Sequence, residues 1–226
     1  MAAQPPSPPS SAYLTQAGLA ASFVRVIRDN WPNLPRAELY GLLQQYARGS
    51  ASLAARDYLR RRTDAGILSS FRPALASAPS PQHFAKTLDW VYADSQTDLA
   101  GAEKRMEGAM TRLALNTGRF TTIAAVEKDR RARLWARETR PGCCYFCAML
   151  AGRGAVYTSA HSAGEDNEFH NHCHCVVVPV FGEYEPTAHA RQWAAEWAAL
   201  KDQHGAVSLN LWRQHFEGRL NQDVPQ

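Results

Sequence analysis

Two short runs of sequence decide how this chain folds: Cys143-Cys144-Tyr145-Phe146-Cys147 and His170-Asn171-His172-Cys173-His174-Cys175. All five cysteines of the protein lie in these two runs, and four of its eight histidines lie between Cys143 and Cys175. Thiolates and imidazoles are typical zinc ligands, and closed structural zinc sites take four of them in a tetrahedron. No other part of the sequence has a residue pattern that indicates a particular chemistry.

The spacing of these donors predicts a structural zinc site. A Cys-x-x-Cys turn brings two thiols within reach of one ion, and a His-x-x-Cys-x-Cys run follows after an intervening polar loop. A thioredoxin-type redox motif has no such second half, and soft thiolate ligands favour zinc over magnesium or calcium. One more donor is present than a tetrahedral ion takes. The candidate ligands are Cys144, Cys147, His170, Cys173 and Cys175.

Two other interpretations of the cysteines stay open. Disulfides are disfavoured because the cysteine count is odd and thiols stay reduced in a cytosol, although an extracellular particle would permit them. A cysteine protease would use Cys143 or Cys144 as its nucleophile and a histidine as its base, but a thiolate held by zinc is not free to attack. His172 and His174 alternate with the cysteines, and we expect them to be exposed bystanders.

Length and composition fit a globular protein with one domain or two small ones. The chain has 226 residues, of which 45% are hydrophobic, and a net charge of +4. This mildly basic balance is compatible with nucleic acid nearby but does not demonstrate it. No apolar run reaches the length of a transmembrane helix, and the first residues have neither the basic start nor the apolar core of a secretory signal. We therefore expect synthesis in a host cytoplasm and no membrane partner.

The hydrophobic pattern predicts a mainly α-helical protein in four parts. Residues 1–10 are rich in proline and serine, which predicts an extended tail. Residues 11–140 form the expected helical domain, and residues 183–226 form a C-terminal helical segment. Between them, residues 141–182 form a small zinc-stabilised β unit made of a knuckle and short strands. This unit is too small to bury a sufficient core without its metal.

Caps and apolar periodicity predict five helices within the helical domain. The second ends near Thr63 in a run of arginines that suits the helix dipole, an interpretation we favour over a phosphate-binding patch. The fourth ends at Asn116-Thr117-Gly118, and the fifth continues to Glu138. Further on, residues 155–158 and 176–181 predict short strands. The five helices are expected to begin near Ser11, Arg36, Pro81, Asp98 and Thr121.

The segment between Glu127 and Arg140 is the most basic in the protein. A solvated helix face with partly paired charges is its default interpretation. The alternative is contact with DNA phosphates, which would involve Arg130, Arg131, Arg133 and Arg137. The sequence contains no glycine-rich phosphate loop and no carboxylate pair spaced for acid–base catalysis, so we predict no catalytic residue.

The region around the cysteines resembles a known family. A basic segment with Trp135 is followed by Gly142-Cys143-Cys144-Tyr145-Phe146-Cys147-Ala148-Met149-Leu150, then by Arg153-Gly154-Ala155-Val156-Tyr157, and finally by the His-x-x-Cys-x-Cys run and a short apolar stretch to Pro179. This pattern is similar to that of the MuF-type minor head proteins of tailed bacteriophages, in the version found in phages of actinobacteria. The close similarity covers residues 130–181.

The resemblance implies a non-enzymatic minor capsid, or head morphogenesis, protein that resides in the virion at the portal and the capsid interior. Its implied partners are the portal protein, the major capsid protein and packaged DNA bound without sequence preference. The family pattern implies the same five candidate ligands for a structural Zn²⁺. Two alternatives from other classes are a head maturation protease and a zinc-containing nucleic-acid-binding module.

Overall fold

A computed structural model of the chain describes residues 10–68, 70–93, 98–159 and 169–220. These residues form seven helices and one two-stranded sheet, so the predicted fold class, mainly α with a small β unit, is confirmed. Of the tail expected over residues 1–10, residues 1–9 lie outside the described part, and Ser10 is the N-cap of α1. Among the described helices, none is both long and apolar enough to span a membrane.

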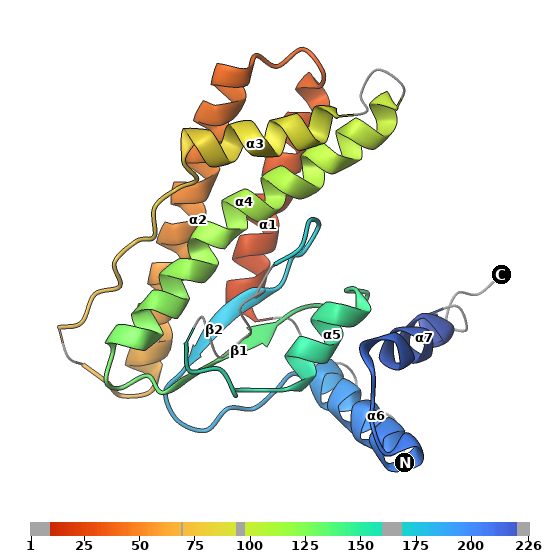
Figure 1. The fold of residues 1–226 in the computed structure, drawn as a ribbon. Coiled ribbons are helices and arrows are strands. Elements are labelled where there is room, and N and C mark those ends of the chain that lie inside the picture. The colour runs from red at the N-terminus through yellow and green to blue at the C-terminus, as the bar shows by residue number, and fades with distance from the viewer. Residues whose placement is uncertain (1–9, 69, 94–97, 160–168, 221–226) are drawn as a thin grey trace.

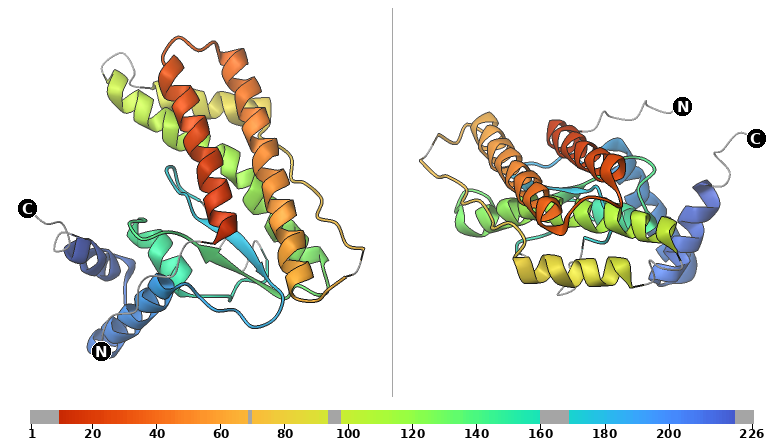
Figure 2. Two further views of the ribbon diagram at one scale, coloured as in Figure 1. Left: turned by 180° about the vertical axis from the view of Figure 1, so that it is seen from behind. Right: turned by 90° about the horizontal axis from the view of Figure 1, so that it is seen from above.

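Four helices make up the body of the molecule. Helices α1 (Ser11–Asn30), α2 (Arg36–Asp64) and α4 (Leu99–Lys128) lie side by side, and α3 (Pro81–Tyr92) packs across α4 (Figures 1 and 2). Three of them begin at a side-chain cap, where Ser10, Ser80 or Asp98 accepts a hydrogen bond from the backbone N–H three residues later. Their shared core contains Phe23, Ile27, Leu43, Leu88, Val91, Met106, Met110 and Leu113.

Helix α4 is longer than the sequence predicts. The expected end at Asn116–Gly118 is wrong, because the helix continues through these residues to Lys128. Gly118 is needed for close packing rather than for a turn. A Cβ atom at this position would lie 2.8 Å from the backbone oxygen of Ser50 and 3.0 Å from Nε2 of Gln16. A glycine therefore allows α1, α2 and α4 to approach one another at this level.

The expected helix from Thr121 to Glu138 is also wrong in its second half. Residues Leu134–Glu138 form strand β1, which pairs antiparallel with β2 (Val176–Val180). Trp135 to Glu138 are all buried, so this segment has no solvent-facing side that an amphipathic helix would present. The strand expected over residues 155–158 is reduced to a single bridge between Tyr157 and Trp135.

The β ribbon lies between the helical body and the remaining helices. Strand β2 packs against α1, α2 and α4, and β1 contacts α5 (Tyr145–Gly152). The C-terminal helices α6 (Ala188–His204) and α7 (Leu209–Leu220) in turn pack on α5, at the end of the molecule away from α3 (Figure 1). Trp193, Trp212 and Phe216 are buried in this packing, as their helical spacing predicts.

The carboxylate of Asp129 ties the end of α4 to α2 just before the ribbon. Its Oδ2 atom accepts hydrogen bonds from Arg62 Nε at 2.8 Å and from the Tyr58 hydroxyl at 3.1 Å, and its Oδ1 atom accepts from the backbone N–H of Arg131 at 3.1 Å. Asp129 and Arg62 are 5% and 2% exposed. Burial alone would raise the pKa of Asp129, but the hydrogen bonds from Arg62, Arg131 and Tyr58 bring it below its ordinary value.

We expect Asp129→Ala to lower the free energy of unfolding by about 3–5 kcal/mol, because the substitution leaves a buried guanidinium without its carboxylate. Asp64→Ala is the matched control, since it removes an exposed partner of Arg60 on the same helix and should cost at most about 1 kcal/mol. Urea titration followed by circular dichroism measures both values. Equal losses in the two variants would contradict the role of Asp129.

Candidate metal centre

The first half of the centre is built by the start of α5. Cys144 is the N-cap of this helix, and its Sγ atom accepts a hydrogen bond from the backbone N–H of Cys147 at 3.4 Å. The helix N-terminus favours the thiolate form of a cysteine. Cys147 is one turn further along, so both sulfur atoms face the same side of the helix start.

The second half is brought to this helix by the segment that leads into β2. Cys144 Sγ lies 3.0 Å from Nε2 of His170, and Cys147 Sγ lies 3.4 Å from the same nitrogen. Cys147 Sγ also lies 3.5 Å from Cys173 Sγ, which is 3.0 Å from Cys175 Sγ. The structure thus brings together all five residues that the sequence singles out. None of these cysteines forms a disulfide.

The five donors form two groups that can hold a metal ion. One group contains Cys144, Cys147 and His170, and the other contains Cys147, Cys173 and Cys175. Sulfur ligands about 2.3 Å from a tetrahedral ion would lie roughly 3.8 Å apart. The observed sulfur–sulfur distances are shorter, at 3.5 Å between Cys147 and Cys173 and 3.0 Å between Cys173 and Cys175. The donor set therefore fits a thiophilic ion, and Cys147 is the donor that both groups share.

The ring of His170 is oriented for ligation through Nε2. Its Nδ1 atom lies 2.7 Å from the backbone carbonyl oxygen of Asn171. Because a carbonyl only accepts hydrogen bonds, Nδ1 carries the proton in this contact, and Nε2 then presents its lone pair to the two sulfur atoms. A hydrogen bond from the other ring nitrogen to a backbone carbonyl fixes the tautomer of metal-binding histidines.

Helix α4 holds the second half of the centre in place. Arg119 donates a hydrogen bond from Nε to the carbonyl oxygen of Cys175 at 2.9 Å and another from Nη2 to that of Cys173 at 2.7 Å. Its guanidinium also lies over the ring of Phe169, 4.1 Å from the centroid. About three turns nearer the start of α4 is Gly108, whose carbonyl accepts a hydrogen bond from the backbone N–H of His172. Arg119 is 3% exposed, and its sequence position gave no sign of this role.

A second buried arginine, Arg137 on β1, completes the positive surroundings. Its guanidinium lies 4.2 Å from the centroid of the Phe169 ring, and its Nη1 atom is 3.9 Å from Cys175 Sγ. The two arginines provide positive charge close to the sulfur atoms, so they favour an anionic thiolate cluster at this position. Phe169, which is 2% exposed, separates this charge from solvent.

The thiols are too crowded to ionise independently. The hydrogen bond from Cys147 and the adjacent His170 ring lower the pKa of Cys144 to about 4. Hydrogen bonds from Cys147 and Cys173, together with the charges of Arg119 and Arg137, hold the pKa of Cys175 well below its ordinary value. The pKa of Cys147 is raised because it donates to these neighbours. A bound cation would remove this conflict by stabilising several thiolates at once.

The neighbouring candidates lie outside the two donor groups. Cys143 is half-buried, and burial raises the pKa of its thiol to about 12. His172 is exposed and lies over Gly108 of α4, and His174 is half-buried. His172 is thus exposed as expected, whereas His174 is more buried than expected.

The four arginines proposed to contact phosphate differ in their exposure. Arg130, Arg131 and Arg133 are exposed in the connection between α4 and β1. Arg137 is 1% exposed and faces Phe169 and Cys175 instead, so it is not presented to an external phosphate. The expected helix face is absent here because this segment is a turn followed by a strand.

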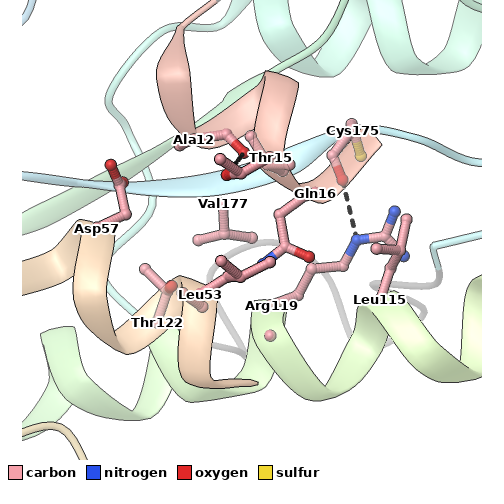
Figure 3. A pocket seen from close by; sticks show the side chains of 13 residues that line it. Ala12, Thr15, Gln16, Leu53, Asp57, Leu115, Arg119, Thr122, Cys175 and Val177 are labelled. Carbon is pink, nitrogen blue, oxygen red and sulfur yellow. Dashed lines mark hydrogen bonds between the residues drawn. The ribbon is translucent and has the colours of Figure 1, made fainter. Parts of the chain in front are cut away.

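A small cavity lies beside the centre, between α1, α2, α4 and β2 (Figure 3). Its volume is about 20 Å³, which is enough for a water molecule but not for a substrate. Gln16 and Thr15 line it from α1, and Arg119 reaches past it to the carbonyl of Cys175. The cavity is thus part of the packing around the centre.

The fold and the centre together define a mainly helical protein in which a cysteine–histidine cluster joins α5 to the start of the β ribbon. A model of the VG15 protein family matches residues 24–200, a span that includes the end of α1, the rest of the helical body, the whole centre and most of α6. The chain therefore belongs to the VG15 protein family, a family of phage proteins. No curated protein and no solved structure matches the chain.

We expect Cys147→Ser to abolish metal binding, because Cys147 is shared by both donor groups. Elemental analysis of the purified protein should find about one zinc ion per chain in the unaltered protein and essentially none in this variant. The melting temperature should fall with the metal content, because binding energy of a structural metal is folding energy.

Cys143→Ser provides the matched control for this substitution, because Cys143 is adjacent in sequence but belongs to neither donor group. It should retain its metal, and its remaining thiols should react only after chelation. Loss of zinc from both variants, or from neither, would contradict the assigned centre.

Proposed function

We propose that this chain is a minor capsid protein that acts in head morphogenesis of a tailed phage, of the MuF type, at the portal and the capsid interior. In this proposal it is a component of the virion and has no catalytic activity. A structural Zn²⁺ joins the start of α5 to the segment that leads into β2.

The observation that carries the proposal is the match to a phage protein family over residues 24–200. It supports virion association over residues 24–200, whereas the similarity to MuF-type proteins rests on residues 130–181. The Arg-Gly-x-Val-Tyr segment of that pattern includes Tyr157, which stacks on Trp135 at 4.4 Å and bridges β1. The residues that carry the resemblance are therefore residues that build the ribbon.

The environment of the centre supports zinc in a structural role. Cys147, Cys173 and Cys175 are buried, and each is 1–3% exposed, whereas a catalytic zinc site keeps a coordination position open to substrate. The zinc would be held by four of the five candidate donors. It would supply no chemistry beyond charge compensation and cross-linking of α5 to the start of β2.

The proposal is tested by assembling heads from the portal protein, the major capsid protein and this chain of one phage. Purified heads should contain this chain in few copies, and it should co-purify with the portal protein. Cys143→Ser should enter heads normally and Cys147→Ser should not, because only the latter loses its metal. Recovery of the unaltered chain solely outside the heads would contradict the proposal.

A head maturation protease is the alternative with a specific geometric observation in its favour. Cys144 Sγ and His170 Nε2 are 3.0 Å apart, which is the distance between the nucleophile and base of a cysteine protease. The same assembled heads decide between the two functions. Truncation of the major capsid protein that requires Cys144 but persists after chelation of zinc would establish the protease, and unaltered capsid protein would exclude it.

A contact with packaged DNA is a second candidate function, supported by the charges around the α4–β1 connection. Arg130, Arg131 and Arg133 are exposed, and in the described part of the chain none of them has a carboxylate within 4 Å. Arg72 joins them at this end of the molecule, because its neighbour Phe71 packs on Tyr58 beside the end of α4. By contrast, the arginines that end α2 are paired with acidic side chains.

We expect duplex DNA to bind this end without sequence preference and with an affinity that falls as salt rises. Four phosphate contacts would give a slope of log affinity against log salt of about −3.6. Changing Arg130, Arg131 and Arg133 together to Gln should reduce that slope to about −1. The control is Arg28→Gln, whose guanidinium is paired with Glu107 and should leave the slope unchanged. A salt-independent affinity, measured by fluorescence anisotropy, would dismiss this contact.

A further inference from the structure

A groove of about 640 Å³ opens on the face of the molecule where α1 begins, α2 ends and the chain leaves β2. The last turn of α2 lines one side of it with Arg60, Arg61 and Asp64, and residues 179–184 line the other. Ser10 and Ser11, the first residues of the described chain, complete the wall. Neither the metal centre nor the arginines of the α4–β1 connection take part in it.

The lining has the chemistry of a site for an extended, proline-rich peptide. Such peptides form polyproline II helices, which have no internal hydrogen bonds and dock in grooves lined by aromatic rings. Phe181 and Tyr184 supply two half-buried rings beside Pro179. Within the described residues the Tyr184 hydroxyl has no hydrogen-bond partner, so it can donate to a peptide carbonyl.

The walls of the groove are held rigidly before any peptide binds. Arg61 pairs with Asp57 at 2.8 Å and with Glu138 of β1 at 3.6 Å. Phe181 packs edge-on against Tyr58, with ring centroids 5.1 Å apart. A preformed groove does not have to be ordered on binding, which lowers the cost of docking a weakly held segment. Because Arg60 and Arg61 are neutralised by their acidic partners, an uncharged peptide suits this groove.

The chain itself carries a segment of this kind directly next to the groove. Residues 1–9 read Met-Ala-Ala-Gln-Pro-Pro-Ser-Pro-Pro and contain no charged side chain. Ser10 has φ −62° and ψ 155°, which are close to polyproline II values. Ser10 therefore already has the backbone conformation that proline residues prefer.

We propose that this groove binds the proline-rich segment formed by residues 1–9 of the same chain, with the proline rings against Phe181 and Tyr184. Covalent attachment at Ser10 provides an effective concentration on the order of 1 mM. The segment therefore covers the groove even if its intrinsic affinity is low.

The test uses a chain that starts at Ser10, which keeps every described residue and the cap of α1, and a synthetic peptide of residues 1–10. Isothermal titration calorimetry should show one peptide per truncated chain, with a Kd on the order of 100 µM. The full-length chain should bind the peptide roughly tenfold more weakly, because its own segment competes at the effective concentration given above. The two chains should have the same fold by circular dichroism.

Two substitutions in the truncated chain assign the binding to the groove. Tyr184→Phe removes only the hydroxyl and should weaken peptide binding several-fold without disturbing the packing, whereas Tyr184→Ala should abolish it. Phe120→Ala is the control, because Phe120 is 46% exposed on α4 and does not line the groove. A peptide with alanine in place of every proline should not bind.

Three results would overturn the proposal. The first is absence of peptide binding to the truncated chain, and the second is equal binding to the truncated and full-length chains. The third is a dimer of the full-length chain that dissociates when residues 1–9 are removed, because it would assign the groove to the segment of a second copy.

Discussion

The buried guanidinium of Arg119 is the contact on which the arrangement of the centre depends. It rises from the middle of α4 and donates hydrogen bonds to the carbonyl oxygens of Cys173 and Cys175, which places both sulfur atoms against α5. In the described part of the chain this cation has no carboxylate partner, and burying an unpaired charge is costly. An anionic cluster of metal-bound thiolates would supply the missing negative charge. The helical body and the centre therefore stabilise each other electrostatically as well as through packing.

The sequence predicts the centre well because metal ligands are chemically distinctive. Cys144, Cys147, His170, Cys173 and Cys175 were recognised by residue type and spacing alone, and the structure brings all of them together. The supporting residues could not be recognised in this way. Arg119 follows Gly118, which in isolation indicates a helix end, and only the packing of Ser50 against that glycine explains why the helix continues.

The prediction of the helices is likewise correct for some segments and wrong for others. Periodicity and caps located α1, α2 and α3 correctly, because each presents one apolar face to the core. The segment Leu134–Glu138 was misassigned because its arginines and glutamate suggest a charged helix face. Its actual state is set by pairing with β2, a partner some forty residues away in the chain, and by the burial of Arg137 next to Phe169. Local sequence carries no information about either contact.

The short distance between Cys144 and His170 is compatible with metal ligation or with nucleophilic catalysis, and the surrounding sulfur atoms distinguish these two roles. In a protease, the base and nucleophile would adjoin an open site that receives a peptide. Here the same histidine nitrogen also lies 3.4 Å from Cys147, and Cys147 in turn lies 3.5 Å from Cys173. Additional soft donors at these distances would compete for any ion near the pair and would occupy the space a peptide needs. This crowding is the physical reason to favour ligation over catalysis.

Helix α5 connects the metal centre to the C-terminal helices. It has only eight residues, which is too short for a helix to be stable alone. Its structure therefore depends on the contacts that it makes at its two ends. Its start carries Cys144 and Cys147, and its carbonyl at Tyr145 accepts a hydrogen bond from Trp212 of α7 at 2.7 Å. At its other end Gly152 allows α6 to approach closely, since a Cβ atom there would lie 3.3 Å from the backbone nitrogen of Ala194. Because α6 and α7 pack mainly on α5, an ion that fixes the start of α5 also determines where the C-terminal helices are held.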